Sequence, residues 1–154
     1  MKAIPAAALL VAVSTFGACQ NSDTAAPSLQ QVVVEPPATT DTFVGTVPVK
    51  GSDSHQFTIS QAGTVSITLT AAGPPPTITM GLGIGAGSTT DSTVCNLLQT
   101  GVVPTAAGTT PQITGTVSQT GPYCVEVFDA NLITGFAGTQ TDAVNYTVTV
   151  THPK

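Results

Sequence analysis

The chain has 154 residues, of which only 7% are charged, and its net charge is −5. Its three basic residues are lysines, so it lacks the positive surface and the arginine side chains with which proteins bind phosphates, and a nucleic-acid partner is excluded. The low charge, together with abundant Thr, Val, Gly and Ala, is untypical of a cytosolic domain and favours half-buried β-strands.

The N-terminal segment has the features of an export signal. Lys2 is followed by an apolar stretch over residues 6–16, which is shorter than the roughly 18 residues that a membrane-spanning helix needs. The run Gly17-Ala18-Cys19 resembles a bacterial lipobox, although Phe16 stands where Leu is usual. We expect residues 1–18 to be removed as a lipoprotein signal peptide.

Cys19 would then be the lipid-carrying first residue of the mature chain. Several acyl chains hold a protein on a membrane stably where one does not, so the protein would be tethered to the envelope without spanning the membrane. The alternative is that Cys19 is an incidental residue of a signal peptide that is cut further along.

Residues 19–40 are predicted to form a flexible tether, because Ser, Thr, Gln, Ala and Pro follow one another there without sustained periodicity. From Asp41 onward, alternating segments are separated by Gly, Pro, Asn and Asp, at the spacing of a sandwich of short antiparallel strands. Residues 41–154 are therefore predicted to be one all-β domain.

The predicted strands place apolar side chains on one face and polar ones on the other. Polar residues separate the apolar ones in most of these strands, whereas glycines do so between residues 77 and 84, where another backbone could approach closely. In chain order, the predicted core faces are Phe57 and Ile59; Val65, Ile67 and Leu69; Ile78, Met80, Leu82 and Ile84; Tyr123, Val125 and Val127; and Tyr146, Val148 and Val150.

Asp53, Ser54 and His55 are the residue types of a hydrolytic triad. Neighbours on an extended chain point to opposite sides, and no Gly-x-Ser-x-Gly elbow is present. His55 is interpreted as a strand-entry residue and His152 as part of a frayed terminus. We therefore expect no enzyme and no catalytic residue.

With Cys19 lipidated, Cys95 and Cys124 are left to pair as a disulfide, the usual state of two cysteines in an exported domain. The bond would close a loop of about 30 residues that contains a turn region over 101–108. A metal or redox pair is the alternative, but the sequence has no CxxC motif and no histidine beside either cysteine.

Asp129, Asn131 and Asp142 lie in or beside a long loop, and their oxygens are of the kind that binds calcium. The alternative is a turn over residues 129–131, because Asx side chains bond their own backbone there. Calcium is the only cofactor that the sequence suggests, and the spacing matches no regular calcium motif.

Five segments in order resemble the bacterial pre-peptidase C-terminal domain, over about residues 41–152. The resemblance implies an antiparallel β-sandwich of jelly-roll type with about eight strands. Members of the family are usually accessory modules of secreted hydrolases, related sandwiches bind collagen or polysaccharide, and no catalytic residues come with the family. This chain departs from the pattern because it carries the cysteine pair, and we expect it to work without an attached enzyme. The segments are Phe43-Val-Gly-Thr-Val, His55-Gln-Phe-Thr-Ile, Gly63-Thr-Val-Ser-Ile-Thr-Leu, Gly121-Pro-Tyr-Cys-Val-Glu-Val and Tyr146-Thr-Val-Thr-Val.

These observations predict a non-catalytic lipoprotein, anchored to the bacterial cell envelope and facing the periplasm or the exterior. Its sandwich would bind an extracellular polymer or protein. The alternative is a structural envelope protein without a specific small ligand. Carbohydrate is the less favoured polymer, because the chain has no Trp and both tyrosines are assigned to the core.

Overall fold

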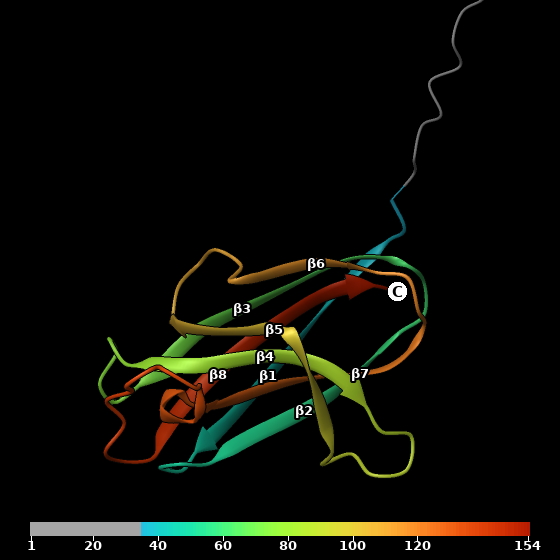
Figure 1. The fold of residues 1–154 in the computed structure, drawn as a ribbon. Helices are drawn as coiled ribbons and strands as arrows, with labels where there is room; N and C mark the ends of the chain where they lie inside the picture. The colour runs from blue at the N-terminus through green and yellow to red at the C-terminus, as the bar shows by residue number, and fades with distance from the viewer. Residues whose placement is uncertain (1–34) are drawn as a thin grey trace, which may run out of the picture. The chain divides into compact units, whose positions relative to one another are not determined.

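Eight β-strands make up most of residues 35–154, the part of the chain that this computed structural model describes (Figure 1). The predicted signal peptide and most of the predicted tether lie outside these residues. The strands are β1 (Ala38–Val47), β2 (Ser52–Ile59), β3 (Gly63–Gly73), β4 (Thr79–Gly87), β5 (Cys95–Ala106), β6 (Ile113–Val117), β7 (Gly121–Asp129) and β8 (Val144–Pro153).

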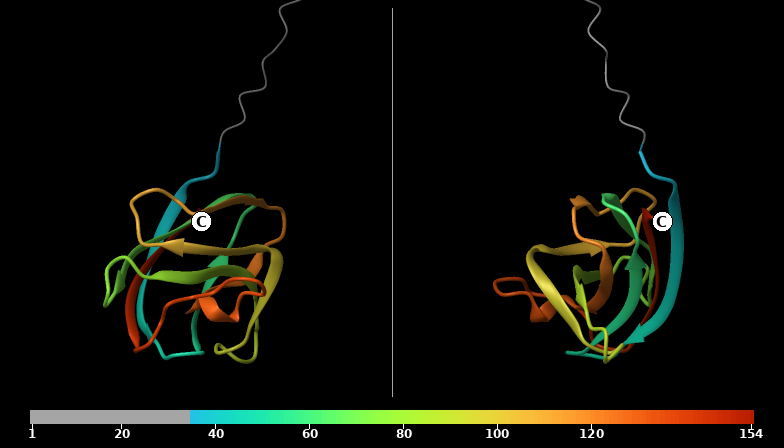
Figure 2. Two further views of the ribbon diagram at one scale, coloured as in Figure 1. Left: turned by 60° about the vertical axis from the view of Figure 1, so that its left-hand side comes forward. Right: turned by 90° about the vertical axis from the view of Figure 1, so that its right-hand side faces the viewer.

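The strands form two four-stranded antiparallel sheets, which lie side by side in the two side views, where blue β1 marks one sheet and yellow β5 the other (Figure 2). Sheet A has the order β1-β8-β3-β6, and sheet B has the order β2-β7-β4-β5. β1 and β2 are therefore edge strands on one side of the sandwich, where they contact each other. We call that side the β1–β2 seam. The predicted all-β sandwich is confirmed.

The core lies between the sheets and consists of the alternating apolar residues that the sequence predicted. Side chains such as Ile67, Val125 and Val148 are completely buried. Their polar neighbours point outward, since successive side chains in a strand alternate between faces. Every residue of the five predicted core faces is buried except Tyr123, which is partly exposed and packs against the core.

The glycines of β4 do not leave an empty face. A Cβ atom at Gly81 would overlap the ring of Phe128, and one at Gly83 would lie 2.7 Å from Leu97 Cδ2. At Gly85 the close neighbour is the backbone carbonyl of Asn96. A backbone thus approaches at one position, while side chains fill the space over the other two.

Two boundaries differ from the predicted ones. β1 begins at Ala38, inside the predicted tether, because it pairs with β8 over its full length, from Ala38 opposite Pro153 to Val47 opposite Val144. Residues 101–106 of the predicted turn region belong to β5, where Val102 and Val103 pair with Gly83 and Leu82. Local composition identified the glycines there, but pairing with β4 makes the segment a strand.

The register of β5 against β4 shifts between Gly83 and Gly85, which pair with Val102 and Leu97. Residues 98–101 therefore bulge out of the ladder, and Figure 1 shows the resulting sharp bend of β5. Helical structure within residues 35–154 is limited to the 3₁₀ turn η1 (Ala130–Leu132). None of it is long and apolar enough to cross a membrane.

Candidate functional site

Three polar side chains meet at the β1–β2 seam. The Tyr146 hydroxyl on β8 donates a hydrogen bond to Asp53 Oδ2 on β2, at 2.9 Å, and lies 2.8 Å from His55 Nε2. Since that hydroxyl proton is given to the carboxylate, its oxygen accepts the proton of His55 Nε2. The cluster ties the edge strand of sheet B to the second strand of sheet A.

Residues of β1 complete this cluster. The ring of Phe43 stacks on His55 with centroids 4.8 Å apart and an angle of 8° between the planes. Gly45 lies against the other two members, because a Cβ atom there would overlap Asp53 Oδ2 and would stand 2.6 Å from the Tyr146 hydroxyl. A glycine at this position is therefore needed for the cluster to form.

The pKa of Tyr146 is raised well above its ordinary value. Burial is the main cause, and the hydrogen bond to Asp53 and the negative charge of Asp53 act in the same direction. Tyr146 is only 3% exposed. The cluster therefore holds the phenol in its neutral, proton-donating form.

Ser54 is not part of this cluster, although it stands between two of its members in the sequence. Its hydroxyl donates to the carbonyl oxygen of Thr93, in the loop between β4 and β5, on the outer side of sheet B. The triad residue types Asp53, Ser54 and His55 thus divide between two faces of β2. Asp53 and His55 meet a tyrosine instead of a serine.

His152 is a buried strand residue, and the prediction that it belongs to a frayed terminus is wrong. It is 3% exposed and lies on β8. Its Nε2 stands 3.0 Å from Asp41 Oδ2 of β1, and its ring packs against Phe57 of β2 with centroids 5.1 Å apart. Pairing with β1 fixes this end of the chain. The two histidines of the protein therefore both lie beside an aspartate at the β1–β2 seam.

Of the three calcium candidates, Asp129 and Asn131 contact each other, whereas within residues 35–154 no hydrogen bond joins Asp142 to either of them. Asp129 is fully buried and caps η1, accepting hydrogen bonds from the backbone N–H of Lys50 and from the backbone and side-chain amides of Asn131. Asp142 accepts a bond from the Thr141 hydroxyl. The predicted Asx turn over residues 129–131 is confirmed.

Within residues 35–154, no group of three or more His, Cys, Asp or Glu side chains is arranged to hold a metal ion. Calcium binding stays a prediction.

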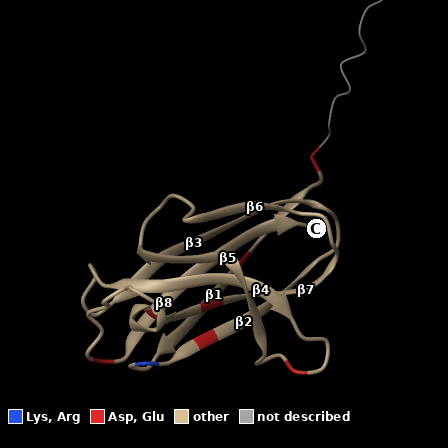
Figure 3. Ribbon diagram, in the orientation of Figure 1, with Lys and Arg blue, Asp and Glu red and all other residues tan. Residues whose placement is uncertain are grey.

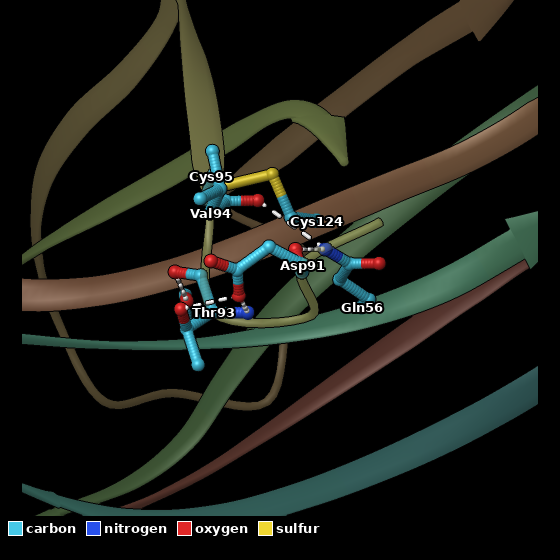
Figure 4. The surroundings of a disulfide bond; sticks show 7 residues. Gln56, Asp91, Thr93, Val94, Cys95 and Cys124 are labelled. Carbon is cyan, nitrogen blue, oxygen red and sulfur yellow. Dashed lines mark hydrogen bonds between the residues drawn. A yellow bond between two sulfur atoms is a disulfide. The ribbon is translucent and has the colours of Figure 1, made fainter. Parts of the chain in front are cut away.

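The predicted disulfide is present and joins Cys95 of β5 to Cys124 of β7 (Figure 4). Both strands flank β4, and the Cα atoms of the two cysteines are 5.6 Å apart. The loop before Cys95 is held to β2 as well, because the side-chain amide of Gln56 donates to the carbonyl oxygens of Asp91 and Val94. The disulfide and Gln56 together fix the first residue of β5, and the loop before it, on sheet B.

Asp91 organises the same loop. Its Oδ1 atom accepts hydrogen bonds from the hydroxyl of Thr93 at 2.6 Å and from the backbone N–H of Thr93 at 2.9 Å. These two bonds lower the pKa of the fully exposed Asp91 carboxyl, the side-chain bond most. This carboxylate shapes a turn rather than facing an open cavity.

The outer face of sheet A carries a surface that the sequence analysis did not identify as a site. Cross-strand register places Thr42, Thr149 and Thr68 in one row and Thr40, Thr151 and Ser66 in the next. We call this surface the hydroxyl face. It consists of Thr40, Thr42 and Thr46 on β1; Thr147, Thr149 and Thr151 on β8; Thr64, Ser66, Thr68 and Thr70 on β3; and Thr114 and Thr116 on β6.

The hydroxyl face is uncharged. The Asp, Glu and Lys residues in the described part of the chain lie in the seam, in loops, on sheet B or near the ends of residues 35–154, and Figure 3 shows how sparse they are. Neighbouring hydroxyls bond each other, as between Thr40 and Thr151 at 2.9 Å. The alternation of Thr with Val along β8 was the signal in the sequence, but only the register shows that four strands join their threonines in one surface.

Cys19, the predicted lipidation site, lies outside the described residues. Comparison with known proteins adds no family: no protein-family description matches the chain, and no curated protein matches it. The site must be interpreted from its own chemistry.

Proposed function

We propose that this protein is an exported, lipid-anchored, non-catalytic binding module whose β-sandwich holds an extracellular polymer or protein. The lipobox-like run ending at Cys19 and the Cys95–Cys124 disulfide support export, since disulfides persist in oxidising compartments. The polar residues of the β1–β2 seam support a structural role for the seam, because they bond one another across the two sheets.

The hydroxyl face is the observation that carries this proposal. Each threonine offers a hydroxyl that donates and accepts hydrogen bonds, next to a methyl group. An uncharged surface repels neither cationic nor anionic partners. A partner can cover it without the desolvation of an ion. It therefore suits a neutral partner that is rich in hydroxyl or amide groups.

The twist of sheet A restricts the partner further. Adjacent strands in a sheet are rotated by about 20–25° on average, so a four-stranded face is curved rather than planar. A flexible chain can follow this curvature, whereas a flat crystalline surface would touch only part of it. We infer that the partner is a single polymer chain or a protein segment.

The order of the strands supports the resemblance to the pre-peptidase C-terminal domain. Two four-stranded sheets with the orders β1-β8-β3-β6 and β2-β7-β4-β5 fit a jelly roll, which has eight strands in two sheets. On this proposal the chain is an accessory module that a lipid at Cys19 holds at the membrane.

A retention assay tests the proposal. Residues 20–154, with the disulfide intact, would be incubated with peptidoglycan, insoluble neutral polysaccharides, collagen and envelope extracts. Saturable retention by one material is expected, and Thr149→Lys should reduce it at least about tenfold, because a charge at the centre of the hydroxyl face must then be desolvated.

The matched control is Thr58→Lys, which places the same charge on an exposed position of β2, on the outer side of sheet B. It should bind like the parent protein. Uniform absence of retention would overturn the binding proposal and favour a structural envelope protein. Equal loss in both variants would show that net charge, and not the hydroxyl face, governs binding.

A further inference from the structure

A second surface with different chemistry lies on the outer side of sheet B. It is an open groove of about 350 Å³, a size at the lower end of small-ligand sites. We call it the Glu126 groove. It is lined mainly by Leu97 and Val102 of β5, Glu126 and Phe128 of β7, and Leu132 and Ile133 after β7.

The floor of the Glu126 groove is set by the glycines of β4. Phe128 lies over Gly81, and Leu97 lies over Gly83. Since neither glycine has a side chain, these two apolar groups sit close to the backbone of β4 and leave space between them. Glu126 pairs with Gly83 in the ladder, so its carboxylate rises beside that space.

The turn after β7 forms one wall of the groove, and hydrogen bonds hold its backbone in place. Leu132 and Ile133 belong to the turn that Asp129 caps, and the N–H of Ile133 donates to the carbonyl of Ala130 at 3.1 Å. Leu132 is 52% exposed although it is a large apolar residue. The turn thus presents an apolar side chain to solvent above the groove on a fixed backbone.

The carboxylate of Glu126 decides what can occupy the groove. It makes no side-chain hydrogen bond or ion pair within the described residues, whose only lysines, Lys50 and Lys154, lie in the β1–β2 turn and at the C-terminus. A wholly apolar occupant would bury this charge without a partner, which is costly, and an anionic one would be repelled. A cation flanked by apolar groups pairs with the carboxylate and covers the walls.

We propose that the Glu126 groove binds an extended segment of a partner protein that carries a lysine or arginine between apolar residues. The basic side chain pairs with Glu126, and the apolar residues two positions before and after it, which point to the same side of an extended chain, pack on Phe128 and Leu132. This site is independent of the hydroxyl face, because it lies on the other sheet.

The test uses three acetylated and amidated pentapeptides, Val-Leu-X-Leu-Val, in which X is Lys, norleucine or Glu. The peptides are titrated into isotope-labelled protein, and the methyl signals of Leu97, Val102 and Leu132 are followed. The Lys peptide should saturate with an affinity at least tenfold above that of the norleucine peptide. The Glu peptide should not bind measurably.

Matched variants separate charge from packing. Glu126→Gln should make the affinities of the Lys and norleucine peptides equal, whereas Glu35→Gln, at the only other glutamate of the chain, should leave the preference intact. Leu132→Ser should weaken both peptides by a similar factor. Because Leu132 and Glu35 are exposed, these two variants should fold normally.

The proposal is overturned if no peptide saturates, if the Glu peptide binds as well as the Lys peptide, or if Glu126→Gln keeps the preference for Lys. Thr149→Lys on the hydroxyl face should leave peptide binding unchanged. A failure at this groove therefore leaves the proposed polymer binding by sheet A to be judged by its own assay.

Discussion

At the scale of single residues, the β1–β2 seam depends on one missing side chain. Gly45 allows Asp53 and the Tyr146 hydroxyl to come together between the sheets. The same contacts bury Tyr146 and keep its phenol neutral, because burial and the neighbouring carboxylate both oppose ionisation. Small changes at the seam should therefore affect stability more than expected for β1, a strand in which exposed and partly buried residues alternate.

Gly45→Ala should destabilise the protein by about 1–3 kcal/mol, the usual effect of forcing an extra carbon into a packed site. Gly115→Ala is the matched control, since no atom lies within 4 Å of a Cβ atom there. It should leave stability unchanged or raise it slightly, because Ala loses less backbone entropy than Gly. Urea unfolding of both variants measures the difference, and equal stabilities would contradict this role of Gly45.

The raised pKa of Tyr146 predicts a loss of stability in alkali. In the unfolded chain a tyrosine ionises near pH 10, whereas the folded protein holds the Tyr146 proton to higher pH. The native state then binds more protons, so this contribution is complete below about pH 10 and is lost as the pH rises beyond it. Unfolding free energies measured across this range should fall more steeply for the parent than for Tyr146→Phe. Parallel curves would contradict the assignment.

At the scale of elements, β4 and β5 show what periodicity does and does not predict. The alternation of Met80, Leu82 and Ile84, with Ile78 just before the strand, was enough to assign the core face of β4. The bend in β5 could not be predicted, because it arises from the register shift opposite Gly83 and Gly85. Pairing between distant segments, rather than local preference, determined these boundaries and the start of β1.

The disulfide should stabilise the β5–β7 connection substantially. It links residues 29 apart in the sequence, and closing a loop of that size is worth about 3–4 kcal/mol in the chain-entropy model. Replacing Cys95 and Cys124 together with serine should lower the unfolding free energy by this amount. Reduction of the parent protein should have the same effect, and a loss below about 1 kcal/mol would contradict the loop-entropy account.

The candidate sites were predictable only in part, for a related reason. Cys95 with Cys124 and the turn at Asp129 follow from residue types and short spacings. The seam cluster joins Asp53 and His55 to Tyr146, more than 90 residues away, and no local pattern indicates such a meeting. The hydroxyl face and the Glu126 groove likewise require the register of several strands.

At the scale of the whole molecule, the two sheets offer unlike outer faces. Sheet A presents hydroxyls without charge, whereas sheet B presents apolar side chains around one carboxylate. A protein held by a lipid at its N-terminus could bind a polymer with one face and a protein with the other. Such a bridge between two partners needs no catalytic activity, which agrees with the proposed non-catalytic role.

The proposed lipid anchor leads to a prediction for the intact protein. In its native host, the protein should be recovered from the membrane fraction with a mass that begins at Cys19 and includes acyl groups. Cys19→Ser should move it to the soluble fraction, because several acyl chains provide the stable attachment. An unmodified parent protein whose mass begins beyond Cys19 would contradict the anchor and indicate a released protein.

The pairing of β1 with β8 brings the two ends of the domain together. Ala38 lies opposite Pro153, and the N–H of Lys154 donates to the carbonyl of Pro37 at 2.9 Å. A domain with adjacent ends can be inserted into a surface loop of another protein, or be circularly permuted, without separating its sheets. The architecture therefore suits transfer of the whole domain between proteins, by evolution or by engineering, while the outer faces of its two sheets stay unchanged.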